Sequence, residues 1–121
     1  MLRLATLAIA LLPLPALALE ATTQVTITLS GNSETNVISY HCEGVETPVS
    51  VTYINANPTF LAFVPVADQK TLFVNVIAAS GARYVSGQYE WWTKGPDATL
   101  TDTTAPEGTA PLTCMEAAES P

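Results

Sequence analysis

The side chains of this chain that could do polar chemistry gather in two turns, around Ser80 and Lys94. Ser80 precedes Gly81, and Lys94 precedes Gly95, so each stands beside a residue that permits a tight turn. A hydroxyl can hydrogen-bond a protonated acid, and an ammonium can pair with a carboxylate. Each turn alone is also what a solvated loop would carry, since a turn serine often bonds its own backbone. An aromatic strand separates the two turns, and we expect this arrangement to present the two polar groups side by side.

Catalytic groups are scarce, which argues against an enzyme. His41 is the only histidine, and its neighbour Cys42 is expected to be committed to a disulfide. Adjacent residues of a strand face opposite sides, so these two cannot form a nucleophile pair. A zinc site needs three or four clustered ligands, which the chain does not offer. No phosphate-binding glycine loop and no nucleophile elbow occurs. We therefore expect no catalytic residues, no metal and no cofactor.

Period-two alternation of apolar and polar residues dominates the sequence and predicts strands. Val25, Ile27 and Leu29, for example, alternate with threonines and Ser30. The expected strands are Val25–Ser30, Asn36–His41, Val49–Ile54, Thr59–Val64, Thr71–Ile77, Ala82–Val85, Gln88–Thr93, Ala98–Thr101 and Leu112–Met115. Glycine, proline, asparagine and aspartate separate nearly all of them at the spacing of short antiparallel connections. The predicted fold is all-β, a small antiparallel barrel of about eight strands.

A single disulfide is expected to close this barrel. Cys42 and Cys114 are the only cysteines, and an even pair in an exported chain indicates a bridge. Closing such a loop constrains the unfolded state by roughly 4 kcal/mol. Residues 102–111 are rich in Thr, Ala and Pro and predict a mobile loop, and residues 116–121 predict a frayed tail.

The first 19 residues predict a secretory signal peptide, because Arg3 precedes an apolar run from Leu4 to Leu17. Residues 20–121 then form one domain, which we expect in the periplasm without a membrane anchor. Eleven acidic residues against three remaining strong cations give this domain a net charge of −8. Nucleic acid and anionic membranes are therefore poor partners, and a basic protein is a good one.

A family resemblance gives the two turns a function. Ser80, Gly81 and Tyr84 match an S-G-x-x-Y segment, and the stretch from Trp92 to Leu100 matches W-x-K-G-x-x-A-x-L. Together with Tyr40, Cys42 and Cys114, this pattern resembles the MliC/PliC family of periplasmic or membrane-bound inhibitors of C-type lysozyme. The resemblance extends from about residue 40 to residue 114. The absence of a lipid-carrying cysteine favours the soluble PliC type.

The resemblance implies that Ser80 and Lys94 enter the lysozyme cleft and meet its two catalytic carboxylic acids. Gly81 and Gly95 belong to the matched motifs and would shape the turns. Tyr84 would support the serine turn or touch the partner, with core packing at least as well founded. Arg83 could reach an acidic group of lysozyme, although a surface ion pair is the default expectation for it. The inhibitor would act as a monomer or homodimer.

Two other interpretations stay open. In the first, Phe60, Phe63 and Phe73 line the interior cavity of a barrel that binds small apolar ligands in the bacterial envelope. A barrel this short should instead be filled by its own side chains. In the second, the chain is a structural or adhesive subunit that self-associates through an open edge strand.

Overall fold

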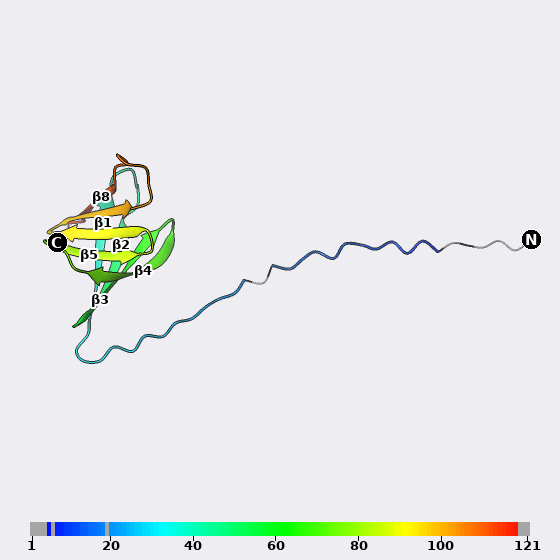
Figure 1. Cartoon of the computed structure of the whole chain (residues 1–121), viewed down its shortest axis with the longest axis horizontal. Helices are drawn as coiled ribbons and strands as arrows, with labels where there is room; N and C mark the ends of the chain where they lie inside the picture. The colour runs from blue at the N-terminus through cyan, green and yellow to red at the C-terminus, as the bar shows by residue number, and fades with distance from the viewer. Residues whose placement is uncertain (1–4, 6, 19, 119–121) are drawn as a thin grey trace, which may run out of the picture.

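The computed structural model describes residues 5, 7–18 and 20–118, and its ordered part is an eight-stranded antiparallel barrel (Figure 1). Its strands are β1 (Glu34–Cys42), β2 (Val49–Ala56), β3 (Thr59–Val66), β4 (Gln69–Val76), β5 (Ala82–Ser86), β6 (Tyr89–Lys94), β7 (Asp97–Asp102) and β8 (Leu112–Glu116). Each strand pairs with the next in sequence, and β8 pairs with β1 to close the barrel. The predicted all-β barrel is confirmed.

The disulfide lies where the barrel closes. Cys42 of β1 and Cys114 of β8 are directly opposite each other in the register, and their sulfurs are bonded. The neighbouring His41 pairs with Met115 and is exposed, whereas Cys42 is buried. The histidine and the cysteine thus face opposite sides of the sheet, as predicted. The bridge joins the first strand to the last, so it holds the single seam between distant parts of the sequence.

Large side chains fill the barrel interior. Trp91, Tyr40, Phe73, Val51 and Val64 are all less than 2% exposed. Fully burying an apolar side chain of this kind contributes about 1.5–3 kcal/mol relative to leaving it in water. Trp91 is 1% exposed while Trp92, the next residue on β6, is 38% exposed. This difference confirms that adjacent tryptophans of one strand cannot both face the core.

The three phenylalanines do not share an interior cavity. Phe73 is fully buried and Phe60 packs against the core from one end. Phe63 lies outside the core cluster, and the Lys70 ammonium is 5.1 Å from the centre of its ring. Along β3, Phe63 follows Ala62, which faces inward, so alternation turns the Phe63 ring outward. The expectation of a phenylalanine-lined ligand cavity is therefore wrong for Phe63.

The strand expected at Val25–Ser30 does not form. Residues 20–33 contain no strand, and the chain runs away from the barrel before β1 (Figure 1). Val25 is 76% exposed and Ile27 is 52% exposed. Alternation predicts that a segment can pair, but pairing also requires a free strand edge placed beside it.

The stretch between β7 and β8 forms hydrogen-bonded turns. Thr103 donates its backbone N–H to Gln88 O at 2.8 Å, and Thr104 donates its N–H to the Asp102 carboxylate at 2.9 Å. The Thr104 hydroxyl also donates to the Asp102 carboxylate, at 2.6 Å. The hydrogen bonds from Thr104, chiefly the one from its side chain, hold the pKa of Asp102 below its usual value. The mobility predicted for residues 102–111 stays a prediction.

The predicted frayed tail begins inside β8. Glu116 donates its N–H to Pro96 O, and Ala117 donates its N–H to Ser39 O, each at 2.8 Å. Residues 119–121 of this tail lie outside the described residues.

Candidate functional site

Both polar turns lie at one end of the barrel. Ser80 and Gly81 belong to the connection from β4 to β5, and Lys94 ends β6 before the turn into β7. In the β5–β6 register Ala82 lies opposite Thr93, so the residues beyond them, Gly81 and Lys94, emerge side by side. The structure therefore brings the predicted serine and lysine turns to the same rim. The connection of residues 103–111 lies at the opposite end, because it joins the end of β7 to the start of β8.

Gly81 lets the serine turn approach β6 closely. Its φ is +68°, a left-handed conformation that side chains other than glycine rarely adopt. A Cβ placed there would lie 2.2 Å from the carbonyl oxygen of Thr93 and 3.0 Å from Nε1 of Trp92. The nearest obstacle is backbone, so it cannot rotate away. Only glycine fits this position without a shift of the strand that ends in Lys94.

A tryptophan links the two turns. Trp92 of β6 donates its indole Nε1–H to the carbonyl oxygen of Ser80 at 2.9 Å. The same strand carries Lys94 two residues later, on the same face of the sheet. This hydrogen bond holds the serine turn against β6. The indole therefore fixes Ser80 relative to the strand that presents Lys94.

The lysine turn is itself anchored at both sides. Gly95 has φ +58°, which allows a two-residue connection between Lys94 and Asp97, the cross-strand pair that ends the β6–β7 hairpin. Pro96, the other turn residue, accepts the hydrogen bond from the Glu116 amide of β8. The Lys94 side chain is exposed, and within residues 20–118 no carboxylate forms a salt bridge with it. Its ammonium is thus available to a partner.

Arg83 lies further from the rim than the two turns. Its Nε is 3.2 Å from a carboxylate oxygen of Glu90, although the N–H is not aligned for a hydrogen bond. This ion pair lies on the outer surface of β5 and β6, where Arg83 is opposite Trp92. A contact from Arg83 to a partner would therefore compete with Glu90.

Tyr84, the remaining predicted site residue, lies in the core. It is 6% exposed, and its ring centre is 5.7 Å from that of Tyr53. Burial raises the pKa of the Tyr84 hydroxyl. A role for Tyr84 in binding stays a prediction, and its position favours support from beneath the turns.

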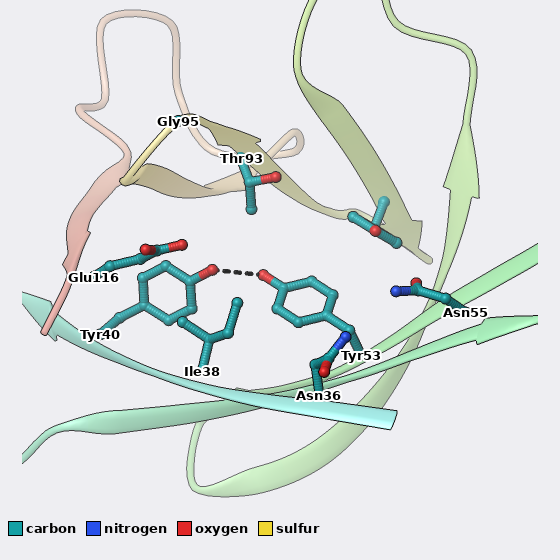
Figure 2. Close-up of a pocket in the computed structure, with 9 residues that line it drawn as sticks. Asn36, Ile38, Tyr40, Tyr53, Asn55, Thr93, Gly95 and Glu116 are labelled. Atoms are coloured by element: carbon teal, nitrogen blue, oxygen red, sulfur yellow. Dashed lines mark hydrogen bonds between the residues drawn. The ribbon is translucent and has the colours of Figure 1, made fainter. Parts of the chain in front are cut away.

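A small polar cavity of about 190 Å³ opens at the mouth of the barrel, on the same end as the two turns. Figure 2 shows the hydroxyls of Tyr40 and Tyr53 meeting at its base, 2.8 Å apart. Trp91 donates its indole N–H to Tyr53 Oη at 2.8 Å, and the ring centres of Tyr40 and Trp91 are 5.2 Å apart, edge to face. Burial, above all, raises the pKa of both Tyr40 and Tyr53.

Sequence reasoning missed this mouth cavity. Asn36, Asn55, Thr93 and Glu116 line it, from four different strands (Figure 2). None of them belongs to a local motif, and they meet only because the barrel closes. No signal in the sequence could have grouped them.

Within residues 5, 7–18 and 20–118, no group of three or more His, Cys, Asp or Glu side chains is arranged to hold a metal ion. No helix there has the length and apolarity needed to cross a membrane.

Comparison with known proteins identifies relatives. The sequence model of the MliC family, "Membrane-bound lysozyme-inhibitor of c-type lysozyme", matches residues 40–107. A membrane-bound lysozyme inhibitor of C-type lysozyme from Pseudomonas aeruginosa is 52% identical over 68 residues, which are 55% of this chain and 53% of the relative. A protein of the same name from Cupriavidus necator is 40% identical over 78 residues, 64% of this chain and 62% of the relative. The chain thus spans little more than half the length of these relatives.

A solved structure agrees with these matches. The crystal structure of Pseudomonas aeruginosa MliC in complex with hen egg white lysozyme is similar at 37% identity and a TM-score of 0.65. The similarity covers 81% of this chain and 100% of that one.

Proposed function

Because the chain belongs to the family of membrane-bound lysozyme inhibitors of C-type lysozyme, we propose that it inhibits such a lysozyme by inserting its Ser80 and Lys94 turns into the active-site cleft. The observation that supports the proposal most is the placement of both turns on one rim, linked by the bond from Trp92 to Ser80. Membership of an inhibitor family also agrees with the prediction that the chain is not an enzyme.

The chemistry of the target explains why these two side chains suffice. A C-type lysozyme cleaves glycosidic bonds with one protonated and one ionised carboxyl group. The Lys94 ammonium pairs with the carboxylate, and the Ser80 hydroxyl hydrogen-bonds the acid. With both groups engaged, the polysaccharide can no longer enter the cleft. The inhibitor needs no chemistry of its own, only side chains held where the substrate would lie.

Rigidity of the rim favours tight binding. Gly81 allows the serine turn to lie against β6, and the bond from the Glu116 amide to Pro96 O holds the lysine turn against β8. Turns that are ordered before binding lose less conformational entropy on association. Arg83 would assist by exchanging Glu90 for an acidic group of the partner, and Tyr84 would assist by supporting the rim from the core.

An envelope location fits this role. The relatives are named as membrane-bound, and a lysozyme acts on the cell wall. We propose export of this chain by the signal peptide of residues 1–19 and residence of the domain of residues 20–121 in the periplasm. Residues 1–4, 6 and 19 of that signal lie outside the described residues.

The function is tested by clearing of a turbid peptidoglycan suspension by C-type lysozyme, with the oxidised protein added in near-stoichiometric amounts. We expect clearing to be suppressed. An unrelated protein of similar size and net charge is the control, since acidic proteins can bind a basic enzyme without specificity. Clearing at the full rate in the presence of the folded protein, or equal suppression by the control, would contradict the proposal.

A further inference from the structure

The barrel retains an open strand edge on β1. On one side, β2 pairs with β1 from Glu34 to Tyr40. On the other side, β8 pairs only with the last three residues of β1, and Ala117 adds one bond to Ser39. Within residues 20–118, the side of β1 that faces β8 has no strand partner from Glu34 to Ile38, and this side is here called the edge. Unpaired N–H and C=O groups on such an edge are a template for another strand.

A groove runs along this edge. It has a volume of about 580 Å³ and meets the unpaired edge only at Val37 and Ile38, since its other lining residues are Ser39, His41, Pro48, Glu116, Ala117 and Ala118. Val37 is 65% exposed on the outer face of β1. The edge therefore offers backbone groups to a short added strand, and the exposed Val37 beside the groove offers apolar surface.

The same chain carries a segment suited to this edge. Residues 25–29, here named the arm, read Val-Thr-Ile-Thr-Leu and lie away from the barrel (Figure 1), with residues 25–28 exposed and Leu29 half-buried. Their β-branched alternation is typical of a strand with one buried face. The arm has five residues, as many as the unpaired edge from Glu34 to Ile38.

Antiparallel pairing of the arm with the edge places the alternating apolar residues of the arm on one face of the sheet. With Val25 opposite Ile38, Ile27 falls opposite Asn36 and Leu29 opposite Glu34. Ile38 packs against the core and Asn36 lines the mouth cavity, so the apolar arm residues would share the inward face. A shift by one residue would turn all of them to solvent.

We propose that the arm of one copy pairs with the β1 edge of a second copy, so that two molecules exchange arms about a two-fold axis near Gly31 and Asn32. In the single chain the arm lies away from its own barrel and has no strand partner (Figure 1), and exchange would give it one. Each copy contributes its arm and its β1 edge, so both arms and both edges are paired and the dimer is closed. This proposal does not depend on the proposed function.

Charge permits this contact in an otherwise acidic protein. From Ala21 to Ile38 the only charged residue is Glu34. In the proposed register Glu34 faces Leu29 of the other copy, so the two carboxylates do not oppose each other. Apart from Glu34, the arm and the edge are uncharged, so two acidic molecules can meet along them with little direct repulsion of like charges.

Single-cysteine variants test the exchange. Thr26 and Val37 are opposite each other in the proposed register and face outward, at a separation that a disulfide can bridge. We would mix purified Thr26→Cys with purified Val37→Cys under mild oxidation and map the disulfides. The expected product is a linked dimer of one copy of each, formed at least tenfold faster than linked dimers of either variant alone. Mixing Thr26→Cys with Thr35→Cys, two residues out of register, is the matched control.

Three outcomes would overturn the proposal. The first is a mixture that stays unlinked while circular dichroism and an intact Cys42–Cys114 bridge show that both variants are folded. The second is linking at the same rate in the out-of-register control. The third is a protein carrying both substitutions that bridges only within one chain and has a monomer mass by light scattering, since the arm would then fold back on its own β1.

Discussion

At the scale of single residues, the candidate site depends on a glycine that no other residue can replace without strain. Gly81 combines a positive φ with a Cβ position blocked by the backbone of Thr93. The hydroxyl of the preceding Ser80 is thereby carried on a turn that lies flat against β6. Ser80 thus supplies the hydroxyl, and its neighbour Gly81 fixes where that hydroxyl lies.

The serine itself is expected to contribute one hydrogen bond to the complex. Ser80→Ala should weaken inhibition by about 1 kcal/mol, the net value typical of one hydrogen bond. Inhibition constants from clearing assays measure this change. Circular dichroism must show an unchanged fold, because a variant that loses its structure would make Ser80 a structural residue instead.

At the scale of elements, the link between the two turns is a property of β6. Trp92→Phe removes the hydrogen bond to Ser80 O and keeps an aromatic ring at the position. We expect inhibition to weaken about fivefold, corresponding to about 1 kcal/mol. The global unfolding free energy should change little, since Trp92 is partly exposed.

The double variant Trp92→Phe/Ser80→Ala shows whether Trp92 acts by positioning Ser80 or by its own contact with lysozyme. If Trp92 acts by holding Ser80, the effect of Trp92→Phe should shrink in a Ser80→Ala background. Full additivity of the two losses would show that Trp92 contributes independently of the serine turn.

The strands were largely predictable, whereas the contacts between them were not. Alternation and turn residues located β1 to β8 within a few residues, because these signals are local. The arm at Val25–Leu29 carries the same signal and forms no strand in the single chain, since a strand requires a neighbour. The Trp92–Ser80 bond and the Tyr40–Tyr53–Trp91 cluster join residues that only the folded register brings together.

The tyrosine cluster should make the barrel sensitive to alkali. Burial raises the pKa of Tyr40, Tyr53 and Tyr84 above their usual value near 10. The folded phenols therefore keep protons that the unfolded phenols lose. The associated stability is present in full below pH 10 and is lost as the pH rises above it.

Denaturant unfolding at pH 8 and at pH 10.5 to 11 measures this loss. We expect the unfolding free energy to fall over this interval, and to fall less in Tyr84→Phe, which removes one buried phenol. A fall of equal size in the variant would show that Tyr84 does not contribute to the pH dependence.

At the scale of the whole molecule, net charge governs how fast the partner is captured. Residues 20–121 carry a net charge of −8, so they should attract a basic enzyme over a distance of about one Debye length. The association rate with lysozyme should fall as salt rises from 20 to 500 mM, with little change in the dissociation rate. Stopped-flow or surface-binding kinetics measure both. An association rate independent of salt would exclude electrostatic capture.

The measurement that tests the central claim most directly compares two lysines of opposite placement. Lys94 lies on the rim that carries both turns, whereas Lys70 lies near the start of β4, toward the other end of the barrel, over the ring of Phe63. Lys94→Ala and Lys70→Ala change the net charge equally, so capture by charge affects both alike. We predict that Lys94→Ala raises the inhibition constant about 30- to 1,000-fold, or about 2–4 kcal/mol, while Lys70→Ala changes it less than about threefold. Equal constants for the two variants would contradict insertion of the lysine turn into the lysozyme cleft.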